Sequence, residues 1–308
     1  MSLTAPTRLL VCVVATLSAM LAGPAMASKP RAPGIDLTTP EGASLGARKM
    51  QCSTVDSEPS IYWFHGESFS RVPGERDRKL FNVEGMNIRT CATVIDAKRG
   101  TGWRLVSREL LFYTDPKSGE LLKKWTNPWT GAEVAVVQTA NDPVNQRPMF
   151  PIGADGKAVT WDATTVGNNW WQTITVPLFY TNPLAGDYQK YIGGSYHATE
   201  MFNFFGTVDD LTDAKRHTAA ITVGWVRIAG WLPWMEMGDR AGLMYTHAAG
   251  RKLDHFDQLP EIMRREIDAN YPAWHSPPPP DDARPNETSW TYFKKKMTSG
   301  AAPNGTQH

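Results

Sequence analysis

Two charged side chains that interrupt apolar strand patterns are the strongest candidates for chemistry in this sequence. Glu200 shares one face of a predicted strand with Phe202, because alternate residues of a strand point to the same side. Arg227 likewise follows Trp225 on one face of another strand, and an arginine buried without a partner is very costly. We therefore expect an ion pair of Glu200 with Arg227 among aromatic rings, where burial favours the protonated carboxyl and suits it to general acid or base chemistry. A purely structural ion pair is the alternative.

Two further residues complete the expected catalytic group. Tyr196 precedes Glu200 on the same strand face and could donate a hydrogen bond to a substrate. His65 ends an aromatic strand on the face of Trp63, although a lone histidine there is more often a hydrogen-bonded core residue. Glu109 also falls on an apolar strand face and is a weaker candidate, because it could simply pair with a neighbouring strand.

Several aromatic and polar residues are expected to bind a ligand. Asn141 opens an Asn-Asp-Pro-Val-Asn turn after a strand, and this loop could hydrogen-bond a ligand or serve only as a turn. Trp234 lies in residues 231–238, an unusual segment rich in Trp and Met that could form a lid or fill the core. Arg240 beside it could position a polar ligand group or pair on the surface. The expected ligand-binding residues are Trp63, Asn141, Phe202, Trp225, Trp234 and Arg240.

The sequence lacks the motifs typical of cofactor-dependent and metal-dependent enzymes. It contains no G-x-G-x-x-G, no phosphate-binding loop, no G-x-S-x-G elbow and no H-E-x-x-H. No cysteine–histidine set has zinc spacing, although seven scattered histidines leave a dispersed metal site open. We therefore expect no cofactor and no metal, and proton transfer is then the accessible chemistry.

The first residues have the pattern of a secretory signal peptide over residues 1–27. Arg8 precedes an apolar run over residues 9–21, and Ala25-Met26-Ala27 is a small-x-small cleavage site. The apolar run is short for a membrane span, which takes about 20 residues. Cleavage after Ala27 would leave a periplasmic or secreted protein without membrane insertion.

The remaining chain gives little sign of a charged partner. Without Arg8 it carries equal numbers of basic and acidic residues, so nothing in its charge steers it to nucleic acid or anionic lipid. The expected partner is instead a small hydrophobic molecule. In an oxidising compartment Cys52 and Cys91 would form a disulfide, with two buried thiols as the alternative.

Patterns of period two predict a mostly β protein. Strands are indicated over residues 60–65, 103–113, 121–125, 133–139, 159–161, 170–179, 196–205, 219–228 and 241–249. One amphipathic helix is indicated from Leu259 onward. Consecutive hairpins favour a single antiparallel β-barrel of the calycin or lipocalin kind, with a two-sheet β-sandwich as the alternative. We expect residues 28–47 to be a flexible lead-in, residues 48–275 to be the single β domain, and residues 276–308 to be a Pro-rich, polar tail.

Several ordered motifs resemble one known family. They are Tyr113-Thr114-Asp115-Pro116, Gly119-Glu120, Trp125-Thr126-Asn127-Pro128-Trp129-Thr130-Gly131, Asn141-Asp142-Pro143-Val144-Asn145, Thr199-Glu200-Met201-Phe202 and Trp234-Met235-Glu236-Met237-Gly238-Asp239-Arg240. Over residues 48–275 the chain is similar to the domain-of-unknown-function family 1838, whose members include exported bacterial proteins. The resemblance implies no reaction and no catalytic residue, so the functional expectation depends on the residues alone.

Three functions remain open from these residues. We expect foremost a cofactor-independent lyase or isomerase acting on a small hydrophobic, aromatic molecule, with Glu200 as general acid or base and Arg227 stabilising negative charge. Elimination of a small carbonyl compound from a plant-derived diaryl compound is one concrete case. The second expectation is a lipocalin-like periplasmic carrier of an apolar ligand, in which the ion pair only orients the ligand. The third is a structural protein whose aromatic residues all fill the core.

Overall fold

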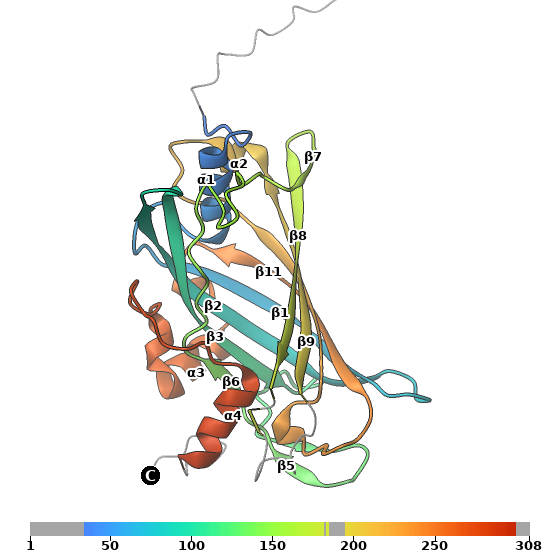
Figure 1. The fold of residues 1–308 in the computed structure, drawn as a ribbon. Helices are drawn as coiled ribbons and strands as arrows, with labels where there is room; N and C mark the ends of the chain where they lie inside the picture. The colour runs from blue at the N-terminus through green and yellow to red at the C-terminus, as the bar shows by residue number, and fades with distance from the viewer. Residues whose placement is uncertain (1–33, 182, 185–194, 300–308) are drawn as a thin grey trace, which may run out of the picture. The chain divides into compact units, whose positions relative to one another are not determined.

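One large antiparallel sheet forms the body of the protein (Figure 1). The computed structural model describes residues 34–181, 183–184 and 195–299. Within these ranges nine strands follow one another in the order β6-β3-β2-β1-β11-β10-β9-β8-β7. Their bounds are β1 Ser60–Arg71, β2 Arg78–Asp96, β3 Gly100–Thr114, β6 Thr139–Asn141, β7 Thr164–Val166, β8 Asn169–Tyr180, β9 Tyr196–Thr207, β10 Thr222–Ala229 and β11 Leu243–Leu253. A small second sheet pairs β4 Lys124–Thr126 with β5 Glu133–Ala135.

The large sheet is open, so the expected closed barrel is wrong. Its outermost described strands, β6 and β7, are three residues long and do not pair with each other. An irregular segment covers the edge of β3 beyond β6, where the backbone N–H groups of Val144, Gln146 and Met149 donate to carbonyls of β3. Because this segment makes hydrogen bonds with the edge of β3, the sheet needs no closing strand there. The alternative, a two-sheet β-sandwich, is also wrong, because nine of the described strands form a single sheet.

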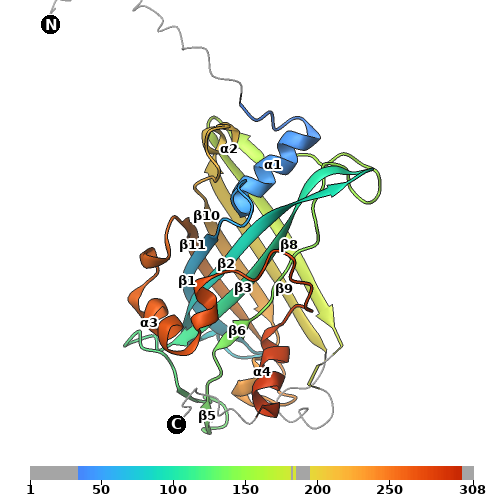
Figure 2. The ribbon, with the colours of Figure 1, turned by 90° about the vertical axis from the view of Figure 1, so that its left-hand side faces the viewer.

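The sheet nevertheless curves strongly about one face (Figure 2). Strands β3 and β9 are five strand spacings apart in the sheet order, which would be about 24 Å on a flat sheet. Glu109 of β3 and Glu200 of β9 are still close enough for their charges to interact. Tyr113 of β3 interacts in the same way with Arg227 of β10. We call the face that carries these four side chains the inner face.

Glycines allow a large ring to lie within the sheet's inner face. Phe64 of β1 lies between Gly85 of β2 and Gly250 of β11 in the strand registers. A Cβ atom at Gly85 would come 2.2 Å from the Phe64 ring, and one at Gly250 would come 2.7 Å from the Phe64 backbone. Only glycine fits at these two places, so the ring of Phe64 can lie over its neighbour and contact Trp225 at 5.1 Å between centroids.

Most predicted strands are confirmed, but one long strand was not predicted, one predicted strand is absent and one is longer than predicted. The longest strand, β2, was not expected, because polar side chains such as Asn82, Glu84 and Asn87 interrupt its apolar pattern. Residues 159–161 form no strand. Gly66 does not end β1, since a Cβ there would lie 2.1 Å from the carbonyl of His247, and glycine thus lets β11 pair alongside.

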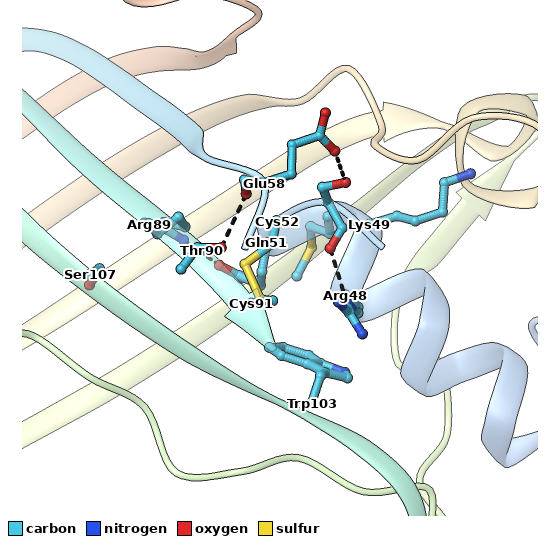
Figure 3. The surroundings of a disulfide bond; sticks show 12 residues. Arg48, Lys49, Gln51, Cys52, Glu58, Arg89, Thr90, Cys91, Trp103 and Ser107 are labelled. Carbon is cyan, nitrogen blue, oxygen red and sulfur yellow. Dashed lines mark hydrogen bonds between the residues drawn. A yellow bond between two sulfur atoms is a disulfide. The ribbon is translucent and has the colours of Figure 1, made fainter. Parts of the chain in front are cut away.

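A helix and a disulfide occupy one end of the sheet (Figure 3). Helix α1, Pro40–Gln51, begins where the Thr39 side chain accepts a hydrogen bond from the N–H of Gly42, so part of the expected flexible lead-in is helical. The expected disulfide is confirmed: Cys52, which follows the helix, is bonded to Cys91 of β2. Both cysteines are fully buried beside Trp103.

Lys252 joins the end of α1 to the sheet, and Lys49 joins α1 to a second helix. The Lys252 ammonium donates to the carbonyls of Lys49 and Cys52, at 2.8 and 3.0 Å, where α1 ends. Lys49 is itself fully buried and donates to the carbonyls of Asp210, Leu211 and Asp213 at the end of helix α2, Val208–Thr212. Cations at helix C-termini satisfy carbonyls that lack partners within the helix.

The C-terminal residues pack against the sheet rather than forming only a polar tail. The expected helix is present as α3, Glu261–Asn270, with short 3₁₀ turns at Pro233–Met235, Phe256–Gln258 and Pro272–His275. A further helix, α4 Ser289–Thr298, buries Trp290, Tyr292 and Phe293 in the main core. The expected signal peptide and the last nine residues lie outside the described part of the chain.

Candidate functional site

The expected ion pair is present on the inner face. Glu200 of β9 and Arg227 of β10 are register partners in the sheet. The Nε atom of Arg227 donates to Oε1 of Glu200 at 3.1 Å, and its Nη2 atom donates to the hydroxyl of Tyr196 at 2.6 Å. The side chains of Arg227 and Glu200 keep 15 and 23% of their surfaces exposed, so solvent or a ligand can still reach them.

A second carboxyl group faces this pair from across the curved sheet. Burial, and then the negative charge of Glu200, raise the pKa of Glu109, while Arg89 and the amides of Asn87 and Asn141 act in the opposite direction. The amide of Asn87 donates to Oε1 of Glu109 at 2.9 Å. Two carboxyl groups that repel each other hold protons unequally, so one of them can be an acid while the other is a base.

An arginine interacts with each of the two carboxyl groups. Arg89 of β2 interacts electrostatically with Glu109, and Arg227 binds Glu200 directly. Arg89 also donates to the side-chain oxygens of Asn87 and Gln51, each at 2.5 Å, and its guanidinium lies 4.6 Å from the centre of the Tyr62 ring. We call Arg89, Glu109, Glu200 and Arg227 the acid–arginine cluster.

Two phenols add hydrogen-bond donors beside Arg227. The Tyr196 hydroxyl accepts from Arg227, so its own hydrogen remains available to a ligand oxygen. Burial raises the pKa of Tyr113, which stays a neutral phenol and lies 3.0 Å from the Thr139 hydroxyl. This end of the cluster can therefore stabilise negative charge on a bound oxygen.

Other expected ligand-binding residues surround the cluster. Trp225 and Phe202 are register partners on the same inner face, and Asn141 of β6 is the register partner of Glu109. Trp234 is buried with its ring 5.3 Å from Tyr113 and 5.7 Å from Phe81, so residues 231–238 pack against the end of the inner face. Of the expected catalytic group, the structure brings Glu200, Arg227 and Tyr196 together.

Three expected site residues lie elsewhere. His65 and Trp63 alternate with Phe64 along β1 and therefore project from the outer face. Both bind the buried carboxyl of Glu84, His65 through Nδ1 at 2.8 Å and Trp63 through its indole nitrogen. Arg240 is exposed, and its guanidinium lies 5.9 Å from the centre of the Trp129 ring. None of the three contacts the acid–arginine cluster.

Sequence reasoning missed the other half of the cluster. Glu109 was weighed only as a weak candidate, and Arg89, Asn87 and Tyr113 were not singled out. The available signal was an alternation in β2, where Asn87 and Arg89 share one strand face, but the strand itself was not expected. Two polar residues at this spacing indicate a shared strand face only once the strand itself is recognised.

A separate hollow of about 950 Å³ lies away from the cluster. Its walls include Trp171, Phe205, Thr222 and Arg251, which come from four neighbouring strands. No residue of the acid–arginine cluster lines this hollow. In the described ranges no three His, Cys, Asp or Glu side chains gather as metal ligands, and no helix there is long and apolar enough to cross a bilayer.

Comparison with known proteins identifies a family but no activity. The family model described as "Protein of unknown function (DUF1838)" matches residues 57–297, which is most of the chain. The match includes every residue of the acid–arginine cluster. No curated protein matches the chain.

Proposed function

Because the chain belongs to the DUF1838 family, whose description assigns no activity, we propose from the site alone that it is a cofactor-independent lyase or isomerase. The proposed substrate is a small hydrophobic molecule with an aromatic ring. The reaction is general acid–base catalysis in the acid–arginine cluster.

The observation that carries this proposal is the pair of carboxyl groups held in different surroundings. Arg227 donates a charge-assisted hydrogen bond to Glu200 at 3.1 Å. Burial and the charge of Glu200 raise the pKa of Glu109, which favours the protonated acid. Glu109 and Glu200 are thus two interacting carboxyl groups in different surroundings, an arrangement typical of the acid and the base of a catalytic site.

The proposed reaction moves protons without any change of oxidation state. Glu200 takes one proton from the substrate, and the freed electron pair shifts toward a substrate oxygen beside Arg227 and Tyr196. Glu109 returns one proton to the product. In an isomerisation the proton returns to another atom of the same molecule, and in an elimination it returns as a bond to the departing fragment breaks.

Apolar side chains on the inner face support a hydrophobic substrate. Phe64, Leu111, Phe202 and Ile174 project onto this face from four different strands. Each is partly rather than fully buried, so it keeps surface for an apolar partner. An aromatic ring packs well on such a surface, because aromatic pairs add attraction beyond area burial alone.

A carrier of a small apolar ligand is the second candidate. The close Glu200–Arg227 pair favours it, because an ion pair that stays closed can orient a ligand without taking part in catalysis. In either case we propose that the protein works in the periplasm or outside the cell. The signal-peptide pattern of residues 1–27 and the Cys52–Cys91 disulfide support this location.

One incubation experiment separates the enzyme from the carrier. The purified protein and its Glu200→Gln and Glu109→Gln variants are mixed with plant-derived phenols and diaryl compounds and followed by mass spectrometry. For an enzyme, one compound is converted by the wild type, and each variant converts it about 10²–10⁴-fold more slowly. Glu133→Gln, at an exposed carboxyl on β5, is the matched control and should keep full activity.

A different result would overturn the catalytic proposal. If every protein retains one compound unchanged, the carrier is supported. If both glutamine variants convert a compound at the wild-type rate, the acid–arginine cluster is not the catalytic site.

A further inference from the structure

We infer that the ligand of the inner face carries a hydroxyl group and a hydrogen-bond-accepting oxygen, which Trp225 and Asn141 recognise. This inference rests on the proposed function, because it concerns the same site and names its substrate class. The ligand is then a hydroxylated aromatic compound, such as a phenol, rather than a hydrocarbon.

The first observation is an indole N–H without a partner. Trp225 lies on β10, with Arg227 two positions along the same inner face. Only 8% of its surface is exposed, yet its Nε1 atom has no hydrogen-bond acceptor among the described residues. An indole nitrogen can only donate a hydrogen bond, and a buried donor without an acceptor is unfavourable. The missing acceptor can be an oxygen of the ligand.

The second observation is an amide oxygen without a partner. Asn141 is also 8% exposed, and its Oδ1 atom has no donor among the described residues. Asn141 is the register partner of Glu109 on the neighbouring strand, so its side chain lies on the same face as the acid–arginine cluster. Among the described residues the oxygen of this amide therefore lacks a donor, and a ligand hydroxyl can supply one.

The two free groups are complementary, and apolar side chains accompany them. The Trp225 ring lies 5.1 Å from Phe64, and Phe202 is its register partner on β9. A ligand that satisfies both groups therefore needs a polar, hydroxylated part and an apolar part that packs on these rings. A hydrocarbon would leave the indole N–H and the amide oxygen unpaired, and sites of this kind reject such analogues.

The test compares para-propylphenol with propylbenzene, which has the same apolar part and no oxygen. Both are titrated into full protein labelled with ¹⁵N at its indole nitrogens, and the Trp225→Phe variant identifies the Trp225 resonance. We expect the phenol to shift this resonance and to bind about tenfold more tightly than propylbenzene, because propylbenzene can form neither of the two hydrogen bonds. In Trp225→Phe, which keeps an aromatic ring, the preference should fall to about twofold.

Asn141→Leu and Trp171→Phe extend the test. Asn141→Leu removes the amide oxygen and should reduce the same preference, whereas Trp171→Phe, at an exposed ring away from the cluster, should not. An unmoved Trp225 resonance, or an unchanged preference in Trp225→Phe, would overturn the inference. Because these titrations measure binding and no turnover, they can succeed when every catalytic test of Glu109 and Glu200 fails, and the reverse also holds.

Discussion

The strength of the Glu200–Arg227 ion pair can be tested by a double-mutant cycle. Removing one member of a fully buried pair costs about 3–5 kcal/mol, because the remaining charge is left without a partner. Arg227 and Glu200 keep 15 and 23% of their side-chain surfaces exposed, so water screens the remaining charge in part. We therefore expect Arg227→Met to lower the free energy of unfolding by about 2–3 kcal/mol at neutral pH.

The double variant should recover part of this loss. In Arg227→Met with Glu200→Gln no ionised carboxylate remains without a partner, so the two losses should not add. The expected coupling is about 1–2 kcal/mol, measured from urea unfolding of the wild type, both single variants and the double variant. The pair Lys124–Glu133 is the control, because its side chains are 68 and 57% exposed, and it should show no measurable coupling.

Two results would refute this reasoning. Additive effects of the two substitutions would mean that the charges do not interact in solution, although the guanidinium donates to the carboxylate at 3.1 Å. A loss below about 1 kcal/mol in Arg227→Met would mean that water reaches Glu200 freely. Either outcome would also weaken the assignment of Arg227 as the group that stabilises a substrate oxyanion.

Three other predictions follow from the same structure. Glu109→Gln should resemble the wild type in stability below pH 4.5, the ordinary glutamate pKa, and become more stable than the wild type as the pH rises. The reason is that folding raises the pKa of Glu109, so the folded wild type keeps this proton to a higher pH than the unfolded chain does. Unfolding at a series of pH values measures the difference in stability, and a difference that does not change with pH contradicts the prediction. Replacing Cys52 and Cys91 by serine removes a link between residues 39 positions apart. This should lower the free energy of unfolding by roughly 4 kcal/mol and the Tm in calorimetry by about 8 °C. An unchanged Tm would show that the link does not constrain the unfolded chain. We expect the mature protein to begin at Ser28, which intact mass measures, and a product that retains Met1 would exclude cleavage.

The sequence was most informative where local rules decide the structure. Glu200 and Arg227 lie on strands that are neighbours in both sequence and sheet, so the period of two was enough to place them on one face. The disulfide was predicted from an even pair of cysteines and the expected oxidising compartment. Helix α3 followed from its amphipathic pattern.

Long-range geometry could not be predicted in the same way. Glu109 joins Glu200 only because the sheet curves across five strand spacings, and no local pattern encodes that curvature. Helix α1 was missed because its glycines and Pro40 suggested a loop, although Thr39 followed by Pro40 is a helix-start signal. The closed barrel was wrong because the irregular segment at the edge of β3 satisfies hydrogen bonds that a closing strand would otherwise supply.

The position of the cluster argues for a functional origin. A curved sheet could bury apolar side chains alone on its inner face, and such a core would be more stable than one that brings two carboxyl groups close enough to repel. Glu109 and Glu200 nevertheless interact electrostatically there, Glu109 also with Arg89 and Glu200 with Arg227. Trp225 and Asn141 beside them leave buried polar atoms without partners in the described structure. Repelling carboxyl groups and unpaired polar atoms both reduce stability, and finding them together is typical of a binding or catalytic site. A bound ligand can supply the hydrogen-bond partners that these atoms lack.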